Sequence, residues 1–240
     1  TGPEHIFEAK DGGLLTAMSD GGAISQLSQG LGVVFEILNM DMKPYPCCRS
    51  AHCAIDGILE IREQMEARLG LKIRNMSEAE ILAEQIQVIE IDTYLVGYKQ
   101  CAVSDGCLHP KTVLDAKFST PYSAAAAFLY GTVGMEQFEP EVVFDPAVQN
   151  LLERVAVRSA DRFTGQYPKH WGCHVKVTMQ DGAVYESEVE DPSGSVARPL
   201  SRDQAMKKAE EFLSVVCPGR EQKTIVELLN LESREQLPII

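Results

Sequence analysis

The clearest helical pattern in the chain lies between residues 50 and 70. Apolar residues recur there at steps of mostly three and four, namely Ala54, Ile55, Ile58, Ile61, Met65 and Leu69. This spacing places them on one side of an α-helix, and Gly70 ends the run. Ser50 is suited to cap the first turn, because its hydroxyl oxygen can accept a backbone N–H. The pattern predicts a helix that buries one face.

A period of two replaces the helical period further along the chain. Residues 86–96 alternate over much of their length and are rich in β-branched side chains, which is typical of a strand. Residues 173–179 and 183–189 alternate as well, and an Asp-Gly pair lies in the segment 180–182 between them. Because Asp-Gly suits a tight turn, these segments predict a β-hairpin. Residues 155–157 predict one more short strand.

Other helices are indicated by their start signals. Ser77 followed by Glu80 fits a capping box. Pro121 falls in the first turn of an alanine-rich segment, where proline is tolerated, and Asp145 can cap a helix that has Pro146 at its first position. The helices expected from these signals and from apolar spacing cover residues 77–85, 119–130, 145–153, 201–216 and 225–231.

The order of the elements predicts an α+β fold. Helices come first, in residues 1–76, an α+β unit follows in 77–199, and helices return in 200–240. Residues 1–40 look largely helical, with an apolar stripe at Ile24, Leu27, Leu31 and Val34. Because residues 21–40 carry little charge, we expect this segment to pack against another surface and to promote association.

Composition and charge narrow the possible functions. The 45% hydrophobic and 24% charged residues are ordinary for a globular protein, and the net charge of −13 argues against nucleic acid or an anionic membrane as partner. We expect no membrane span, because no run of about twenty apolar residues occurs, and no signal peptide. Seven cysteines without a regular framework favour a reducing, cytoplasmic compartment.

The loop before the helix at 50–70 concentrates the chemistry. Pro44 and Pro46 keep it extended, so a stiff loop leads into a helix N-terminus, where backbone N–H groups and the helix dipole favour an anion. Lys43 and Arg49 could hold carboxylates, and His52 could move a proton near neutral pH. On residue type alone, the alternative is a surface lysine, an arginine bonded to a helix end and a histidine enclosed in the core.

Two stretches rich in cysteine or histidine raise the question of a metal site. The first contains Cys47, Cys48, His52 and Cys53, and the second contains His170, Cys173 and His174. Adjacent cysteines rarely point at one metal, and Cys173 would face away from the two histidines on a strand. We therefore expect structural thiols and no metal. No P-loop or dinucleotide-binding glycine motif is present, so we expect no cofactor.

The sequence Lys-Pro-Tyr-Pro-Cys-Cys-Arg-Ser-Ala-His at residues 43–52, followed by Ile55-Asp56, resembles the signature of the MmgE/PrpD family. That family includes 2-methylcitrate dehydratases, cis-aconitate decarboxylases and iminodisuccinate epimerases. Thr1-Gly-Pro-Glu with Phe7-Glu8 and the segment 110–131 are similar to two further blocks of the family. The three blocks occur in the same order and spacing, so the resemblance covers most of the chain.

The resemblance implies a helical domain whose chain leaves to build a smaller lid domain, residues 77–199, and then returns. It also implies that members are markedly longer, with a large helical region before the position that Thr1 matches. We therefore expect a second polypeptide that carries this N-terminal helical half, in a homo- or hetero-oligomer, and an enzyme that is inactive without it. A fragment of a longer protein is the other explanation.

The resemblance also implies roles for particular residues. The candidate catalytic residues are Lys43, His52 and Tyr122, and the candidate substrate-binding residues are Arg49, Cys48, Lys117 and Ser119. Some family members carry a histidine at the place of Cys48, so either Cys48 or His52 would have to serve in its stead. For Tyr122 the alternative is a place in the lid core, and for Lys117 it is a solvated position.

Together these features predict a cofactor-independent lyase that acts on a small di- or tricarboxylate. A base would remove a proton α to a carboxylate, and cationic groups would stabilise the charge that develops. We expect a dehydratase acting on an acid like 2-methylcitrate. A cis-aconitate-type decarboxylase or an iminodisuccinate-type epimerase would use the same site, and a non-catalytic subunit of a split enzyme is the alternative from another class.

Overall fold

The computed structural model describes residues 7, 13–20 and 23–230. It divides into two compact units, residues 1–40 and 41–240. In the first unit, the helices are α1 (Leu14–Met18), α2 (Ile24–Leu27) and the 3₁₀ helix η1 (Glu36–Asn39). The described helices cover less of residues 1–40 than the largely helical segment that we expected. Just beyond α2, Gly30 and Gly32 take positive φ angles of 75° and 77°, which an α-helix does not accommodate.

A four-stranded sheet with the order β2-β1-β3-β4 forms the centre of the second unit. Its strands are β1 (Ile86–Thr93), β2 (Val155–Ser159), β3 (Cys173–Met179) and β4 (Val184–Val189). β1 pairs parallel with β2 and antiparallel with β3, and β3 and β4 form the expected hairpin with Gly182 at φ 85°. Helices combined with this mixed sheet confirm the α+β fold.

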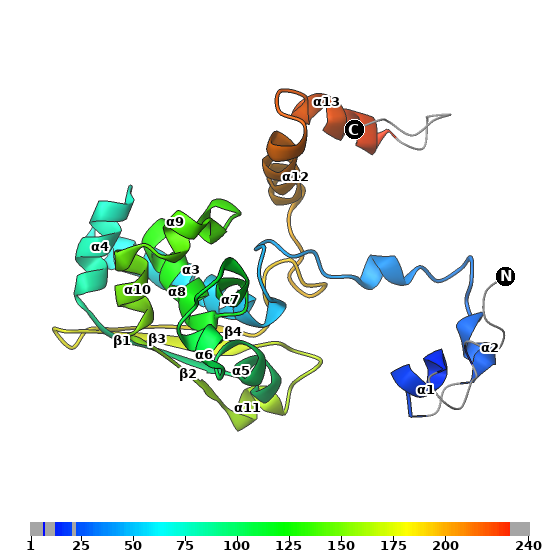
Figure 1. Ribbon diagram of the computed structural model, residues 1–240, viewed down its shortest axis with the longest axis horizontal. Coiled ribbons are helices and arrows are strands. Elements are labelled where there is room, and N and C mark those ends of the chain that lie inside the picture. Colours follow the sequence, from blue (N-terminus) through cyan, green and yellow to red (C-terminus); the bar gives the residue numbers. More distant parts are fainter. Residues whose placement is uncertain (1–6, 8–12, 21–22, 231–240) are drawn as a thin grey trace. The chain divides into compact units, whose positions relative to one another are not determined.

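Helices α3 (His52–Leu69) and α8 (Thr120–Tyr130) pack on each other on one side of the sheet (Figure 1). α3 contacts β3 and β4, whereas α8 contacts β2. A side chain at Gly57 would place its Cβ 2.7 Å from the Val175 side chain, so glycine lets α3 approach β3 closely. α3 ends at Gly70, as expected, in the left-handed conformation at φ 65°.

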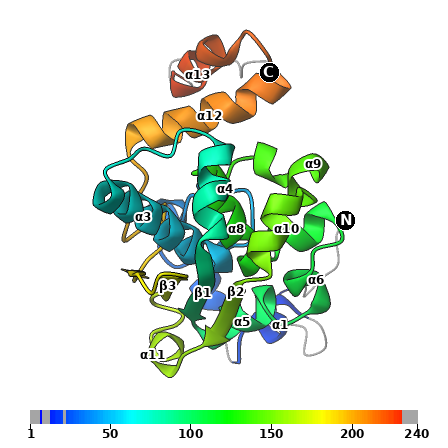
Figure 2. The same cartoon turned by 90° about the vertical axis from the view of Figure 1, so that its left-hand side faces the viewer.

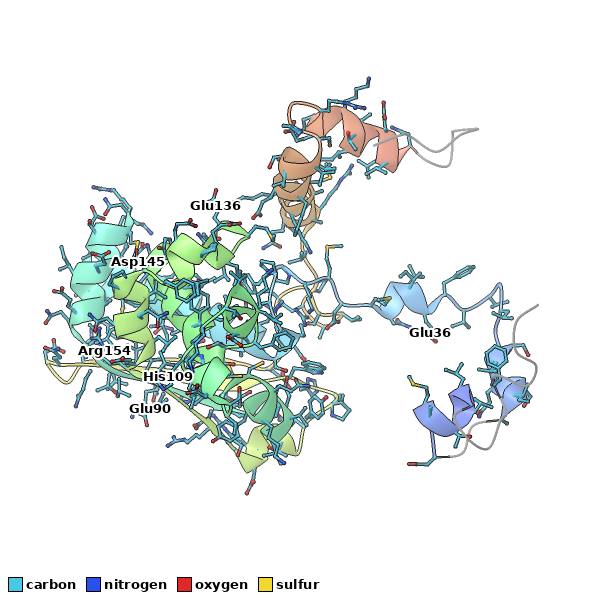
Figure 3. All side chains as sticks on the ribbon, in the orientation of Figure 1. Glu36, Glu90, His109, Glu136, Asp145 and Arg154 are labelled. Carbon is cyan, nitrogen blue, oxygen red and sulfur yellow. The ribbon has the colours of Figure 1, made fainter. Side chains whose placement is uncertain are left out.

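The two faces of the sheet differ in chemistry. Ile89 and Ile91 of β1 and Val175 and Val177 of β3 are wholly buried beneath the helices. The alternate residues face away from them and carry charge, as Glu90 does (Figure 3). Arg158 of β2 donates to Asp92 at 2.5 Å on this open face. The alternation read from the sequence therefore corresponds to one packed and one solvated face.

The remaining helices surround this core, and α4 and α10 flank α8 (Figure 2). They are α4 (Met76–Glu84), α5 (Leu95–Cys101), α6 (Asp105–Leu108), α7 (Val113–Lys117), α9 (Pro140–Val143), α10 (Pro146–Leu152), α11 (Asp161–Thr164), α12 (Arg202–Val216) and α13 (Glu221–Leu229), with the 3₁₀ helices η2 (Arg49–Ala51) and η3 (Glu136–Phe138). Asp145 caps α10 as expected, since its side chain accepts the Ala147 N–H at 2.8 Å.

Three helix and strand boundaries differ from the sequence expectation. Asn75, not Ser77, caps α4 by accepting the Glu78 amide at 3.0 Å. The 3₁₀ turn η2 takes up Ser50, so α3 begins at His52. β1 stops at Thr93, two residues before α5 begins, and Gly97 of α5 packs so closely on the Tyr94 ring that a Cβ would lie 2.8 Å from it.

The division at residues 76 and 199 stays a prediction. The structure adds that α3, which we placed with the helical segment 1–76, packs directly on the sheet. None of the helices in the described ranges is long and apolar enough to cross a membrane.

Candidate active site

The loop at residues 41–48 leads into η2 and is held by main-chain hydrogen bonds to distant segments. The Met42 N–H donates to the Gly194 carbonyl at 2.8 Å, and the Cys48 N–H donates to the Lys117 carbonyl at 2.8 Å. Lys43 is exposed, and its Nζ donates to the Cys47 carbonyl at 3.2 Å. The loop therefore presents the Lys43 ammonium to solvent from a fixed backbone.

Arg49 lies beneath this loop with only 8% of its surface exposed. Its guanidinium donates to the Asp41 carboxylate at 3.0 Å, to the Ser193 carbonyl at 2.9 Å and to His52 Nδ1 at 3.1 Å. The Nε atom is buried and makes no hydrogen bond in the structure. These contacts favour a role in positioning the loop, because most of the guanidinium is already engaged.

His52 is wholly buried at the start of α3. Since a guanidinium only donates hydrogen bonds, His52 Nδ1 must accept from Arg49, and the proton of the neutral ring lies on Nε2. Burial, followed by the nearby charge of Arg49, lowers the pKa of His52 to about 3. His52 is therefore uncharged at neutral pH and a weak base there.

A second group of contacts joins α3 to the segment after β4. The Tyr45 hydroxyl donates to Asp56 at 2.6 Å, and the Ser193 amide donates to the other carboxylate oxygen at 2.7 Å. The Arg198 guanidinium lies 3.6 Å from the same carboxylate. Burial, and then the Asp56 charge, raise the pKa of Tyr45 well above its usual value. Tyr45 therefore keeps its proton and acts as a hydrogen-bond donor.

Lys208 of α12 is a candidate residue that the sequence did not reveal. Its Nζ donates to the Lys43 carbonyl. Burial lowers the pKa of Lys208, the nearby Glu211 charge opposes this, and the Lys43 charge adds to the lowering. A cavity of about 200 Å³ lies between the loop and α12, lined by residues that include Tyr45, Ser193 and Lys208. In the described part of the chain, neither Lys43 nor Lys208 forms an ion pair with a carboxylate. Nothing in the local sequence signals Lys208, because it comes from 165 residues further along.

The cysteines of the loop have opposite environments. Cys47 is buried, which raises the pKa of its thiol to about 12. Cys48 is partly exposed, and the pKa of its thiol is lowered to about 6. The largest cause is a hydrogen bond from the Cys101 thiol, and Ser50 and the Lys43 charge lower the pKa further, whereas partial burial acts in the opposite direction. Cys48 is thus the more readily ionised of the two.

The candidates of the second sequence block have their side chains engaged mainly outside the loop. Tyr122 is wholly buried, and its hydroxyl donates to the Gln137 carbonyl, so its contacts favour the core alternative. Ser119 is also buried and caps α8 by accepting the Tyr122 N–H at 3.0 Å. Lys117 is half-buried with its Nζ 5.8 Å from the centre of the Phe138 ring. The hydrogen bond between Lys117 and the loop is made by the Lys117 main-chain carbonyl, which accepts the Cys48 N–H.

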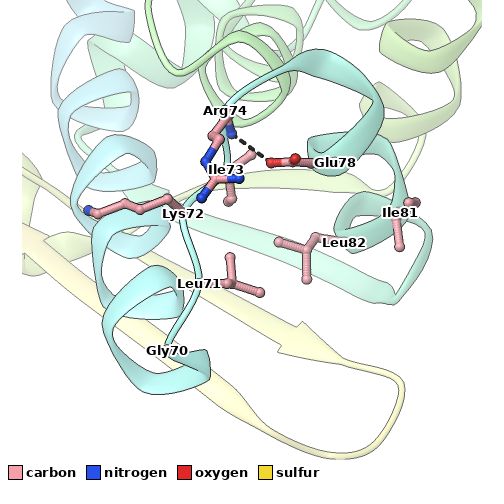
Figure 4. A pocket seen from close by; sticks show the side chains of 8 residues that line it. All are labelled: Gly70, Leu71, Lys72, Ile73, Arg74, Glu78, Ile81 and Leu82. Carbon is pink, nitrogen blue, oxygen red and sulfur yellow. Dashed lines mark hydrogen bonds between the residues drawn. The ribbon is translucent and has the colours of Figure 1, made fainter.

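Two other places on the chain lie apart from this loop. The three residues His170, Cys173 and His174 do not converge, because Cys173 is buried whereas His170 bonds to Asp191 at 2.9 Å and His174 faces Glu186. A cavity of about 450 Å³ lies between the end of α3 and α4, where Leu71 and Leu82 line it (Figure 4). None of the residues that line this cavity belongs to the loop 41–48. The loop with Lys43 and Arg49, together with Lys208, therefore remains the candidate site.

Comparison with known proteins identifies the family of the chain. A sequence model of the MmgE/PrpD C-terminal domain matches residues 45–232. The chain belongs to the MmgE/PrpD family. The matched range contains Cys48, Arg49 and His52 as well as Lys208, and it begins just after Lys43.

Two curated relatives carry names that indicate decarboxylation. This MmgE/PrpD chain is 22% identical over 241 aligned positions to the cis-aconitate decarboxylase-like protein oryM of Aspergillus oryzae, covering 97% of the chain and 47% of the relative. It is 23% identical over 132 positions to the cis-aconitate decarboxylase of Mus musculus, covering 55% of the chain and 27% of the relative. The chain thus spans less than half the length of either relative.

Proposed function

We propose that this chain forms the cationic part of the active site of a cofactor-independent lyase that acts on a small di- or tricarboxylate. The observation that carries the proposal is a cavity of about 200 Å³ whose lining includes the side chains of Lys207, Lys208 and Glu211, with Lys208 Nζ bonded to the Lys43 main-chain carbonyl at its edge. The two lysines outnumber the one carboxylate on this lining, and the charge of Lys43 also acts on Lys208, so the cavity favours an anion. A substrate carboxylate fits this requirement.

The same cations would help the chemistry. When a proton leaves the carbon next to a carboxylate, negative charge spreads onto the carboxylate oxygens, and a fixed ammonium stabilises that charge more than it stabilises the ground state. Loss of a β-hydroxyl from this carbanion gives a dehydratase, for which an acid like 2-methylcitrate is the substrate that we propose. Arg49 would hold the loop in place through Asp41 and Ser193.

Decarboxylation is the second candidate. It is favoured by the names of the two relatives, both of which are cis-aconitate decarboxylases or resemble them. The cationic pair would serve this reaction equally well, because loss of carbon dioxide also leaves a carbanion beside a carboxylate. Re-protonation without loss of a group would give an epimerase.

A further segment should cover the exposed apolar side chains of the first unit. Side chains of the first unit that would normally be buried are exposed, among them Leu31, Val33 and Leu38 at 74%, 82% and 78%. Exposed apolar groups in such number indicate a surface that another segment covers. We propose that this segment is the N-terminal helical half, supplied by a second polypeptide or by the same one.

The test combines binding and turnover. Citrate and cis-aconitate would be titrated into the chain by calorimetry, and the enzyme assembled with its helical half would be assayed for water loss, carbon dioxide release and racemisation. Lys43→Ala and Lys208→Ala should each weaken carboxylate binding about ten- to hundredfold, the effect of about 1.5–3 kcal/mol for a charged hydrogen bond. Lys223→Ala, an exposed lysine of α13, is the matched control. Unchanged affinity in both site variants would refute the proposal.

A further inference from the structure

Three side chains that can bind a metal ion meet just beyond the end of β4. His170 Nδ1 lies 2.9 Å from Asp191 Oδ2 and 3.7 Å from Glu190 Oε1. One ligand atom from each of the three side chains lies within 4.8 Å of the other two. None of these residues lines the cavity beside Lys208. A site here would therefore be separate from the carboxylate site proposed above.

The separations between these atoms fit coordination of a single ion. Zinc holds imidazole nitrogen and carboxylate oxygen at about 2.0–2.2 Å, so two ligands of one tetrahedral ion lie about 3.4 Å apart. The two nitrogen–oxygen distances fall on either side of this value. A metal ion would take the place of the proton that lies between His170 Nδ1 and Asp191 Oδ2. The imidazole favours zinc over magnesium, which prefers oxygen ligands.

The two carboxylates lack a lysine or arginine partner. In the described part of the chain, Glu190 and Asp191 form ion pairs only with His170, whereas Glu188 is paired with Arg162 at 2.8 Å. Asp191 is also enclosed, since only 15% of its side chain is exposed. Enclosed charges are normally paired or coordinate a metal. One imidazole carries at most a single positive charge, so a divalent cation would balance the two carboxylates more fully.

The backbone brings the three side chains together. The His170 N–H donates to the Gln166 carbonyl at 3.0 Å, which fixes the loop before β3. A Cβ added at Gly172 would lie 3.0 Å from the Val189 carbonyl oxygen and 3.1 Å from the Glu190 carbonyl oxygen. Glycine therefore lets this loop approach the end of β4 closely. The ligand positions are set by the fold before any ion binds.

The ligands open onto a cavity of about 370 Å³. His170 and Asp191 line this cavity together with Trp171 and Ser195. The side chains of His170 and Asp191 are both partly exposed, so an ion can enter from solvent. The cavity also leaves room for water at the remaining coordination positions. Three protein ligands and a water are a common coordination set for zinc.

We propose that His170, Glu190 and Asp191 bind one divalent transition-metal ion, for which zinc fits best. The ion links the loop before β3 to the residues after β4, and it therefore stabilises the start of the segment whose Ser193 accepts a hydrogen bond from Arg49. This role is structural and does not depend on the proposed lyase function. The sequence expectation of no metal considered His170 only with Cys173 and His174, whereas the fold places it beside two carboxylates.

Binding is tested by titrating zinc chloride into the EDTA-treated chain in a calorimeter, with magnesium chloride as the comparison. Wild type should bind zinc and show no comparable heat with magnesium. His170→Ala should weaken zinc binding by at least about a hundredfold, since even the loss of an outer-shell partner costs about 10–100-fold. His174→Ala is the matched control, because this partly exposed histidine of β3 lies 3.9 Å from Glu186 and belongs to no such group. Its zinc affinity should equal that of wild type.

Asp191→Asn is a second variant, which keeps the shape of the side chain and removes its charge. Zinc should raise the midpoint of thermal unfolding in wild type and in His174→Ala, because an ion that binds only the folded state stabilises it, but not in Asp191→Asn. Zinc held by cysteines would leave the affinity unchanged in both site variants and would overturn the proposal. An equal loss in His174→Ala, or no zinc binding by wild type, would overturn it as well. None of these outcomes bears on the lyase, whose lysines lie in another cavity.

Discussion

The Arg49 guanidinium donates to His52 Nδ1 at 3.1 Å inside the protein. This contact fixes the histidine as the Nε2-protonated tautomer and places a positive charge next to its ring. A histidine held in this way is a structural acceptor, and its protonation would bring two buried cations together.

This relationship predicts that acid destabilises the protein through His52. Its pKa of about 3 lies below the ordinary value of 6.5, so between these values the unfolded chain binds more protons than the folded one. Stability should therefore be fully present above pH 6.5 and decline as the pH falls toward 3, by up to about 4 kcal/mol. Urea unfolding at stepped pH should show a flatter decline in His52→Gln, whereas the exposed control His109→Gln should follow wild type. Equal slopes in wild type and His52→Gln would contradict the prediction.

Gly194 predicts a backbone constraint on the loop. It takes a φ of 78°, and a Cβ added there would collide with the Met42 carbonyl. Gly194→Ala should therefore destabilise the protein by more than the roughly 1–3 kcal/mol of a strained left-handed residue, because the collision with the Met42 carbonyl adds to that strain. Gly182→Ala is the matched control, since Gly182 also has a positive φ of 85° but faces open space. Thermal unfolding of both variants would measure the difference, and an equal loss would show that the contact with Met42 does not matter.

A substitution of Tyr122 would distinguish a role in the active site from a place in the core. Its hydroxyl donates to the Gln137 carbonyl in the core, so Tyr122→Phe should leave that acceptor unsatisfied and lower stability by about 1–3 kcal/mol. Citrate affinity should be the same as in wild type, because the hydroxyl does not face the loop cations. Calorimetric titration and urea unfolding would test the two effects together. Weaker citrate binding at unchanged stability would restore Tyr122 to the substrate site.

The start of α4 gives a clean comparison of two caps. Asn75 accepts the Glu78 N–H at 3.0 Å, whereas the sequence favoured Ser77. Asn75→Ala should cost about 1 kcal/mol, the usual effect of losing an N-cap. Ser77→Ala lies inside the helix and should be neutral or slightly stabilising, because alanine has the higher helix propensity. If Ser77→Ala were the more damaging change in urea unfolding, the assignment of Asn75 as the cap would be wrong.

Much of the fold could be predicted from local patterns. The apolar spacing of α3, the alternation of β3 and β4 and the cap at Asp145 all depend on neighbours in sequence, and the structure contains each of them. The end of β1 could not be predicted in this way. The apolar run continues past Thr93, but the Tyr94 ring stacks on Tyr167 at 4.7 Å and the chain turns into α5.

The candidate site was only half visible in the sequence. Its loop was found, because two prolines, two basic residues and a histidine are concentrated there. The roles within it depend on partners from far along the chain. Ser193 and Asp41 engage Arg49, and Lys208 joins Lys43 from α12. Local sequence does not reveal which distant groups converge. Arg49 was therefore expected to bind substrate, although in the folded chain its guanidinium donates hydrogen bonds to Asp41 and Ser193.

The ties between the segments 41–56 and 193–198 have a consequence for the integrity of the molecule. Met42 forms a hydrogen bond with Gly194, and Arg49 forms one with Ser193. Asp56 accepts a hydrogen bond from Ser193 and forms an ion pair with Arg198. These contacts join two segments that lie before and after all four strands in the sequence. A protease that nicked the exposed hairpin turn at 180–182 would cut the backbone between them. The two pieces should nevertheless elute as one species under native conditions and separate only in denaturant.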